Sequence, residues 1–436
     1  MSKSILAALA VLSLAPRADA FCGFFVGKAD AQLFNKASQV AIVRDGQHTV
    51  ITMGNDYSGP LTEFALVVPV PSVLQKEQIH LGEKKLLDRL AEYSAPRLVE
   101  YTDPDPCDQR RALGEVAKMA PMAAMSGARV GYATRKAMGV TVEASYTVGE
   151  YDIVLLSAKD SGGLEAYLRD SGYRIPQRAA DALAPYVKQK MKFFVARVNL
   201  KEAHGVQQLR PIQIAFDSER FMLPIRLGMA NAESGAQDLI VYAMTRKGRV
   251  ESTNYQTAQM PGDVDVPEFV QKDFGGFYKS AFAQALRSHD GRAVFTEYVW
   301  NMGSCDPCSA PPLEQSELAA LGVFWLDVTG YHGGGMPLTL TRLHVRYDGE
   351  HFPEDLLFQA TGDQQPFQAR YVLRHPFRGD VSCASGQQYL QQLAARRRAE
   401  AVTLAQLTGW SPQSIAQRMG PDAPPAPAQW WKRLWQ

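Results

Sequence analysis

The sequence predicts an α+β fold with mixed, largely antiparallel sheets, and three features of its pattern support this class. Short runs typical of strands fill residues 38–71 and dominate again at 192–245 and 338–375. Segments with helical spacing separate these runs at irregular intervals, and residues 384–420 have a helical pattern throughout. Neither regular βαβ alternation nor an unbroken series of hairpins is present, which leaves the α+β class.

The first twenty residues have the pattern of a secretory signal peptide. Lys3 supplies a positive start, residues 5–14 are apolar, and a small-x-small cleavage site ends at Ala20. The apolar run is shorter than the roughly 20 residues that cross a bilayer. Phe21 stands where a lipoprotein signal carries a small residue, so no lipid is expected on Cys22. We expect cleavage near Ala20 and a soluble protein that is periplasmic or secreted.

Charge and length limit the class of protein and the number of domains. Removing residues 1–20 takes away Lys3, Arg17 and Asp19, which lowers the formal charge from +1 to zero. This balance gives no general attraction to nucleic acid. The remaining 416 of 436 residues exceed the roughly 250–300 at which one core stops growing, so two domains or subdomains are expected. Changes of pattern place a β-rich domain at residues 21–158, an α+β domain at 159–383 and C-terminal helices at 384–420.

The N-terminal domain is expected to begin with a β-hairpin. Residues 40–43 and 50–52 are typical of strands and flank Asp45-Gly46, a dipeptide that suits the positive φ angles of a tight turn. Residues 63–71 form an almost continuous apolar run, which predicts a strand buried on both faces. The remaining elements are a helix at 82–96 and two strands within 140–158 that separate near Gly149.

The second domain is expected to mix helices and strands without a regular order. Gly172 divides two helical patterns within residues 161–191, and Gly275-Gly276 weakens a third at 266–289. A segment with two cysteines follows a strand at 293–300 and precedes a short helix at 313–322. Further strands are expected at residues 192–200, 211–217, 221–227, 238–245, 338–347, 355–361 and 367–375.

The C-terminal residues 421–436 form a Pro-rich spacer and a Trp-rich tail. In the tail, Trp430, Trp431 and Trp435 surround two cations. Aromatic rings mixed with cations suit peripheral contact with a membrane or with a partner. The alternative is a tail that docks on its own domain or is frayed.

Several stretches also resemble a known family. They comprise residues 21–46, 64–71, 93–107, 223–228, 238–245, 305–308, 352–361 and 367–379. With these stretches the chain resembles a bacterial family of uncharacterised proteins, domain of unknown function 2330. The resemblance implies an extracytoplasmic protein and carries no established activity or catalytic residue.

Five cysteines are expected to act mainly as disulfides, because thiols commonly pair outside the cytoplasm. Two bridges at most can form, which leaves one thiol over. Cys305 and Cys308 can close a small loop, and a longer bridge such as Cys22 to Cys107 would then leave one free cysteine. Alternatively, Cys305 and Cys308 enter separate long-range bridges. The disulfide candidates are Cys22, Cys107, Cys305, Cys308 and Cys383.

The pair Cys305 and Cys308 also supports a redox hypothesis. A strand precedes it, a helix follows it, and Pro307 occupies the position found in thioredoxin-like proteins. Pro337 precedes a later strand, as does the proline that faces the active pair in that fold. However, residues 309–312 separate the cysteines from the helix, so its N-terminal amides are expected to point elsewhere.

Residues 103–139 carry a third hypothesis. This segment is rich in Ala, Met and Gly without a stable period, so we interpret it as an insert or an embedded loop. Within it Met119, Met122 and Met125 are three positions apart, and thioether sulfurs select Cu(I). The alternative is a Met-rich helix face or a flexible insert. Joint metal binding by Cys305, Cys308 and His332 is a weaker variant of the same hypothesis.

The motifs of hydrolases and phosphate-binding loops are absent. The sequence has no G-x-S-x-G elbow, no phosphate-cradling glycine loop and no H-E-x-x-H. We therefore expect a disulfide-stabilised binding or structural component of the cell envelope, with an unknown partner or ligand, no cofactor and no established catalytic residue. A thiol–disulfide oxidoreductase is the alternative, and periplasmic copper binding is the third hypothesis.

Overall fold

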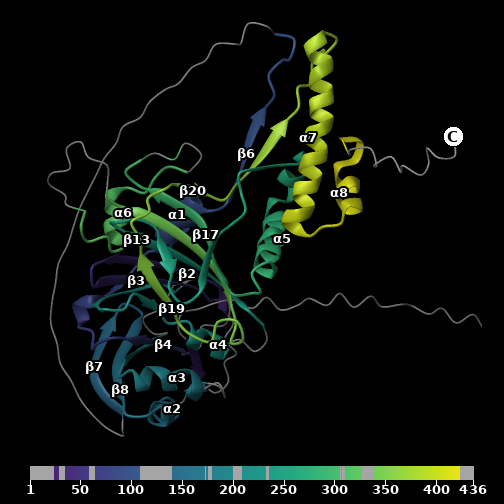
Figure 1. The fold of residues 1–436 in the computed structure, drawn as a ribbon. Helices are drawn as coiled ribbons and strands as arrows, with labels where there is room; N and C mark the ends of the chain where they lie inside the picture. The colour runs from purple at the N-terminus through teal and green to yellow at the C-terminus, as the bar shows by residue number, and fades with distance from the viewer. Residues whose placement is uncertain are drawn as a thin grey trace, which may run out of the picture.

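The computed structural model confirms the α+β class (Figure 1). Its strands form two large sheets and two three-stranded sheets, with helices on their outer faces. The structure describes residues 24–28, 35–57, 64–108, 140–171, 173–174, 179–199, 209–231, 235–304, 306, 310–326 and 337–422.

The first large sheet has six antiparallel strands. Strand β4 lies inside the sheet, and its residues 66–70 are all buried, as the continuous apolar run predicted. Val67 points to one face of the sheet, and its neighbours Leu66 and Val68 point to the other. The strand order is β7 (Val140–Val148), β8 (Tyr151–Ala158), β10 (Lys192–Val198), β4 (Phe64–Val70), β1 (Phe24–Lys28) and β9 (Tyr173–Arg174).

The second large sheet has nine strands and is mostly antiparallel. The expected hairpin is present, with Gly46 in the turn at a φ of 60°. Two pairs are parallel, β2 with β13 and β15 with β17. The order is β15 (Gln256–Gln259), β17 (Ala293–Asn301), β18 (Thr339–Tyr347), β13 (Gln237–Thr245), β2 (Asn35–Asp45), β3 (His48–Tyr57), β11 (Ile212–Asp217) and β5 (Ile79–Leu81), and β20 (Phe367–Gln368) pairs with β17.

These two sheets pack face to face as a sandwich around a shared apolar core. Strand β2 illustrates how alternation builds it. Val40 and Ile42 point into the layer between the sheets, whereas Ala41 and Val43 point to the outer face of the second sheet. Because apolar side chains cover both faces of this strand, residues 40–43 are all buried.

Helices cover the outer faces of the sandwich. Leu86, Leu87 and Leu90 lie on one side of α1, and they pack on the second sheet together with α6. Asp160 begins α2 by accepting a hydrogen bond from the backbone N–H of Gly163 at 2.6 Å. No helix within the described ranges has the length and apolar character to cross a membrane. The elements are α1 (Lys84–Ser94) and α6 (Gln315–Ala320) on the second sheet, and α2 (Ser161–Asp170) and α3 (Ala179–Lys188) on the first.

A small three-stranded sheet lies beside the sandwich. One of its segments differs from the structure expected from the sequence. Residues 221–227 were expected to be a strand, but only β12 is extended and a helical turn, α4, begins at Arg226. The buried carboxylate of Asp355 explains the change, because it accepts hydrogen bonds from the backbone N–H groups of Ile225 and Arg226 at 2.9 and 3.3 Å. The elements are β12 (Met222–Leu223), β19 (Leu356–Ala360), β14 (Val250–Ser252) and α4 (Arg226–Asn231), whereas η1 (Lys76–Gln78) lies directly before β5 beside the second large sheet.

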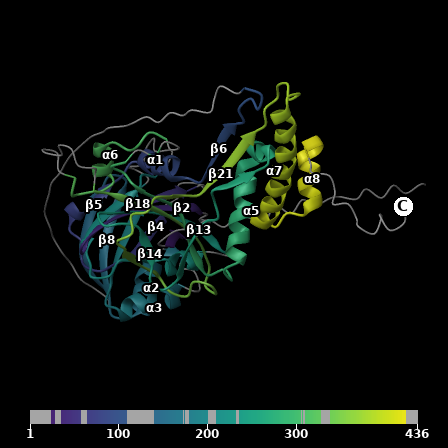
Figure 2. The ribbon, with the colours of Figure 1, turned by 45° about the horizontal axis from the view of Figure 1, so that its top comes forward.

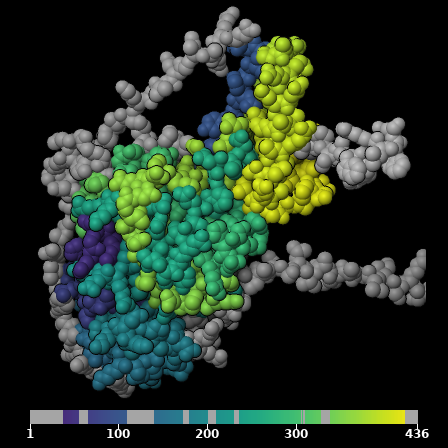
Figure 3. Space-filling view, viewed as in Figure 1, coloured from purple at the N-terminus to yellow at the C-terminus, as the bar shows by residue number. Residues whose placement is uncertain are grey.

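The remaining elements form what we call the C-terminal unit. A parallel three-stranded sheet packs with helices around its own apolar core, which includes Phe277, Tyr371 and Leu404. Figures 2 and 3 show α7 and α8 beside α5, with β6 and the start of α7 projecting away from the sandwich. The unit comprises β6 (Arg97–Thr102), β16 (Val264–Val266), η3 (Glu268–Asp273), α5 (Phe274–Arg287), β21 (Arg370–His375), α7 (Ala384–Thr408), α8 (Pro412–Met419) and η4 (Gly420–Asp422).

The division into domains stays a prediction. Both large sheets combine strands from before and after residue 158, where the first domain was expected to end. Strand β4 precedes that residue and β10 follows it, and the two pair with Val70 opposite Lys192. In the second sheet β2 likewise pairs with β13. Both large sheets therefore need chain from before and after the expected boundary.

Candidate functional site

A cavity of about 370 Å³ opens between the two large sheets, and we call it the inter-sheet slot. Apolar side chains from both sheets form its walls, and each points inward because alternate residues of a strand share a face. The slot opens where β4 ends and β10 begins, and Pro71 lies just past the end of β4. The walls are Ile51, Met53, Val68, Ile214, Phe216 and Leu223.

Polar groups lie at the mouth of the slot. The guanidinium of Arg220 donates a hydrogen bond to the side-chain carbonyl of Gln189, so the loop after β11 is joined to the turn before β10. Lys190 in that turn has a φ of 58°, a left-handed conformation that costs a residue with a side chain roughly 1–3 kcal/mol. Both segments are thus held in defined positions around the opening.

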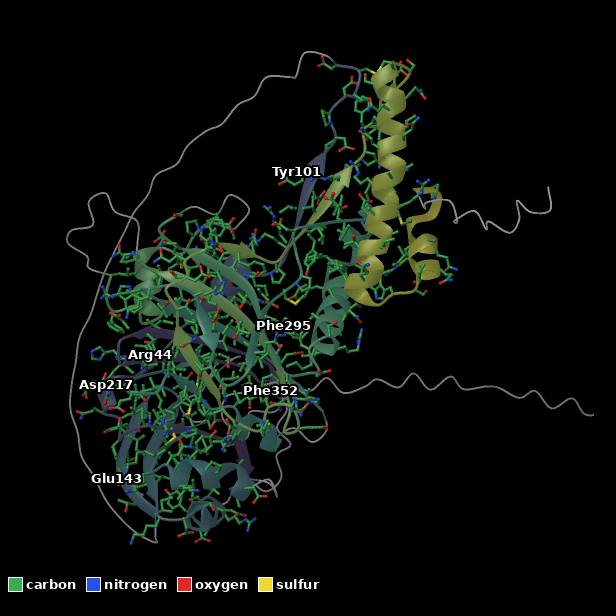
Figure 4. The ribbon with its side chains drawn as sticks, in the orientation of Figure 1. Arg44, Tyr101, Glu143, Asp217, Phe295 and Phe352 are labelled. Atoms are coloured by element: carbon green, nitrogen blue, oxygen red, sulfur yellow. A yellow bond between two sulfur atoms is a disulfide. The ribbon has the colours of Figure 1, made fainter. Side chains whose placement is uncertain are left out.

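Arg44 positions the loop that carries Arg220. It is 8% exposed and forms no ion pair within the described residues. Instead it donates to the carbonyl oxygens of Ser218 at 2.9 Å and of Glu219 and Arg220 at 3.3 Å, and its guanidinium lies 5.1 Å from the Phe221 ring. Burial lowers the pKa of Arg44. Figure 4 labels Arg44 and Asp217, which begins this loop region, on the same flank of the sandwich.

This arrangement is suited to binding and offers little for catalysis. Among the described residues that line the slot, the ionisable side chains are Glu219 and Arg220, and both lie at the exposed mouth. Neither has a partner that would form a nucleophile and base pair. A volume of about 370 Å³ lies at the lower end of the 300–1,000 Å³ typical of small-molecule sites.

A second group of polar residues is buried between the second sheet and α5, and we call it the Glu297 network. Glu297 is fully buried and accepts hydrogen bonds from Arg342 at 2.6 Å, from His344 at 2.7 Å and from the Tyr278 hydroxyl. A β-bulge in the pairing of β17 with β18 falls at Glu297. His344 also contacts Asp238 at 3.3 Å, and Arg346 donates two bonds of 2.8 Å to the same carboxylate.

Opposing effects set the charges of this network. Burial raises the pKa of Glu297, but Arg342 and His344 outweigh burial and bring it down to about 2. Burial likewise lowers the pKa of His344, yet the two carboxylates raise it above its ordinary value overall. His344 stacks on Phe282 of α5 with ring centroids 3.8 Å apart, and Phe282 packs in turn on Phe295, which Figure 4 labels. We interpret the network as a structural junction between the sandwich and the C-terminal unit.

The described disulfide differs from the Cys22–Cys107 bridge that was expected as an example. Cys107 is bonded to Cys383 with Cα atoms 6.0 Å apart, so the pairing of Cys107 with Cys22 is wrong. The bridge joins the end of the β6 segment to the start of α7, where the Cys383 sulfur accepts from the backbone N–H of Gly386. Cys22, Cys305 and Cys308 lie outside the described residues.

The neighbours of the cysteine pair are described in part. Asp306, between the two cysteines, is buried, and its carboxylate accepts from the Tyr298 hydroxyl at 3.0 Å and from Gln368 at 3.2 Å. An aspartate that served only to form a turn would keep its carboxylate in solvent. The carbonyl oxygen of Pro337 accepts a hydrogen bond from the Trp325 indole at 3.1 Å. The redox role of Pro337 stays a prediction, as does the exchange chemistry of the pair.

The remaining predicted site residues lie outside the described ranges. These are Met119, Met122, Met125 and His332 of the metal hypothesis, and Trp430, Trp431 and Trp435 of the tail. Both hypotheses therefore stay predictions.

The slot was not predicted from the sequence, although partial signals for it are present. Ile212, Ile214 and Phe216 alternate with polar or small residues, which indicates one apolar face. The polar run 217–220 then stands directly between that strand and the apolar residues 221–225. A single buried arginine in an apolar strand, Arg44, is a further signal, because such a cation needs dedicated acceptors.

The comparison with known families agrees with the resemblance noted from the sequence. A family described as an uncharacterized protein conserved in bacteria, DUF2330, matches residues 16–359. The chain belongs to this family. The match includes both large sheets except β20, and it ends before β21, α7 and α8. No curated protein and no solved structure matches the chain.

Proposed function

We propose that this DUF2330 protein is a disulfide-stabilised binding component of the cell envelope that takes an amphiphile with an apolar chain and an anionic head into the inter-sheet slot. The observation that carries the proposal is the combination of apolar walls with a mouth where the Arg220 guanidinium lies next to Glu219 in the sequence. Each methylene that leaves water for the slot contributes about 0.8 kcal/mol. The head group would stay at the surface beside Arg220.

The expected location rests on the leader and on the sulfur chemistry. The first twenty residues have the pattern of a signal peptide. The Cys107–Cys383 bridge supports this, because disulfides persist in the periplasm and outside the cell but are rare in the cytosol. A structural component without a ligand is the competing proposal.

Titration calorimetry with two ligands of equal chain length tests the proposal. Oxidised protein without residues 1–20 is titrated with dodecanoate and with the uncharged dodecanol. We expect both to bind, with dodecanoate the tighter. Arg220→Gln should remove this preference, because the charge at the mouth is lost, and dodecanol binding by the same variant measures any effect of losing the bond to Gln189.

A matched pair of substitutions shows whether the slot is the binding site. Met191 and Met229 are both half-buried against apolar clusters of the sandwich, but only Met191 lines the slot. Met191→Trp should fill the opening and weaken dodecanol binding at least tenfold, whereas Met229→Trp should not. No binding of either ligand, or equal losses in the two variants, would overturn the proposal and favour a structural component.

A further inference from the structure

A second cavity, of about 310 Å³, lies in the C-terminal unit, and we call it the basic cleft. Residues of η3, of α7 and α8, and of the end of β21 enclose it. Its lining contains six basic side chains and two carboxylates, a formal charge of +4. The basic residues are Lys272, Arg374, Arg378, Arg396, Arg397 and Arg418, and the carboxylates are Glu268 and Glu400.

Three of the guanidinium groups are held by carboxylates outside the lining. Arg374 bonds to Asp265 at 3.0 Å. Arg396 forms two bonds, of 3.0 and 2.7 Å, with Asp103. With Asp273, which lies 3.6 Å from Arg418, these carboxylates reduce the formal excess to +1. They also fix the direction of each fork, which lowers the entropy that an incoming acceptor would otherwise have to overcome.

Aromatic rings also hold Arg418. The guanidinium of Arg418 lies 4.5 Å from the ring centroid of Trp410 and 5.2 Å from that of Phe269. In contrast, the Arg378 side chain is 81% exposed at the edge of the cleft, and its contact with Glu268 is 3.6 Å long. The cleft thus has cations oriented by carboxylates or rings, and Arg378 is a strongly exposed cation at its edge.

Glu400 is the exception in this basic surrounding. Its side chain is 8% exposed, and its contact with Arg396 is 3.4 Å long. Burial raises the pKa of Glu400 to about 7, with Asp265 and Glu268 adding to the effect and Arg396 and Arg397 opposing it. As a carboxylate it repels an anion, and as a carboxylic acid it can donate a hydrogen bond. The other charged groups that line the same cleft are Lys272, Arg374, Arg378 and Arg418.

We propose that the basic cleft binds a phosphate-type oxyanion, with Glu400 setting the dependence of binding on pH. Guanidinium groups reach the cleft from β21, α7 and α8, and a tetrahedral oxyanion offers acceptors in several directions, whereas one planar carboxylate is satisfied by a single fork. The cleft lies largely in residues beyond the family match, so this function would be additional to that of the slot.

Calorimetry with inorganic phosphate and pyrophosphate at constant ionic strength tests the site. We expect saturable binding that Arg378→Gln and Arg397→Gln each weaken at least fivefold. Arg287→Gln is the control, because Arg287 is an arginine of α5 outside the cleft. Equal binding by wild type and both cleft variants would overturn the proposal.

Glu400→Gln gives a result that general loss of structure cannot imitate. At pH 8 the variant should bind pyrophosphate at least threefold more tightly than wild type, because a carboxylate is removed from the site. At pH 6, where Glu400 already carries a proton, the two affinities should agree within twofold. Weaker binding by the variant at both pH values would contradict the role of Glu400.

Vesicles distinguish a free phosphate compound from a lipid head group. Protein is sedimented with phosphatidylcholine vesicles that contain either phosphatidic acid or no anionic lipid. If Arg378→Gln reduces binding to phosphatidic acid and pyrophosphate competes for it, the ligand is a head group. Binding of pyrophosphate without vesicle binding assigns the cleft to a soluble compound. Failure of both arms overturns the proposal and leaves the slot untouched.

Discussion

His344 in the sandwich and His375 in the C-terminal unit have the same kinds of partner in different surroundings. Each contacts one glutamate at 2.7 Å and a second carboxylate at 3.3 Å. However, His344 and its partner Glu297 are 12% and 0% exposed, whereas His375 and Glu100 are 29% and 43% exposed. Both histidines have a raised pKa, so the comparison shows how burial changes a site with two carboxylate partners.

The two sites reach their raised pKa by different routes. The hydrogen bond with Glu100 is the main cause at His375, and burial opposes it as the next largest effect. At His344 burial is the largest effect and lowers the pKa, and Glu297 and Asp238 together outweigh it. A buried pair that loses one member leaves a charge without compensation, whereas an exposed pair regains water.

Removing one carboxylate from each site should give the largest contrast. Glu297→Gln takes the buried carboxylate away from both Arg342 and His344, so we expect a loss of about 3–5 kcal/mol in the free energy of unfolding. Glu100→Gln should leave this free energy unchanged within error. Urea denaturation followed by circular dichroism measures both. Equal effects would show that burial is not the deciding difference.

Neither histidine site could be predicted in full from the sequence, although the strands that carry them could. The runs 338–347 and 367–375 were expected to be strands, and β18 and β21 lie within them. The partners come from far along the chain, since Asp238 is 106 residues from His344 and Glu100 is 275 residues from His375. Alternation within a strand indicates which side chains share a face, but not which distant strand lies beside them.

The slot and the disulfide show the same limit. Alternation at residues 211–217 indicates an apolar face, yet the cavity opens where β4 ends and β10 begins, and this depends on how the two sheets end together. Cysteine spacing restricts the possible bridges without selecting one. Here the parallel pairing of β6 with β21 brings Cys107 near Cys383.

Removing the disulfide should loosen the C-terminal unit more than the sandwich. The bridge closes a sequence separation of 276 residues, and we expect Cys107→Ser with Cys383→Ser to cost about 2–4 kcal/mol. Hydrogen exchange should show lost protection in β6 and in the first turns of α7, with β2 and β13 unchanged. Simultaneous loss in all four elements would mean that the two regions open as one.

The Glu297 network should contribute to the pH dependence of stability from both sides of neutrality. Because the pKa of His344 is raised in the folded state, its contribution is complete below about pH 6.5 and is lost as pH rises through the raised pKa. The pKa of Glu297 is lowered to about 2, so its contribution is complete above about pH 4.3 and is lost as pH falls toward 2. Stability from the Glu297 network should therefore be highest between these limits.

Matched variants of the two histidines show how much each one contributes to the dependence of stability on pH. Denaturation midpoints measured from pH 6 to pH 9 should fall in the wild type as His344 loses its proton. His344→Gln should start lower and remove the part of this decline that comes from the buried site, and His375→Gln should remove only the part that comes from the exposed site. An undiminished decline in His344→Gln would place the titrating group elsewhere.

The effect of salt on the pKa of the two histidines should be the smallest difference between the sites, and measuring it needs no substitution. The Debye length falls from about 10 Å at 0.1 M to about 3 Å at 1 M ionic strength, and exposed pairs are screened far more than buried ones. Salt should therefore weaken the effect of Glu100 and Glu268 on His375, and the pKa of His375 should move down toward its ordinary value in 1 M NaCl. NMR of the His375 ring protons measures this pKa. The pKa of His344 should stay in place, because solvent ions cannot approach Glu297 or the Phe282 ring stacked on the imidazole. Equal salt shifts for both histidines would mean that water reaches the Glu297 network, and the contrast between the two regions would then have to come from packing alone.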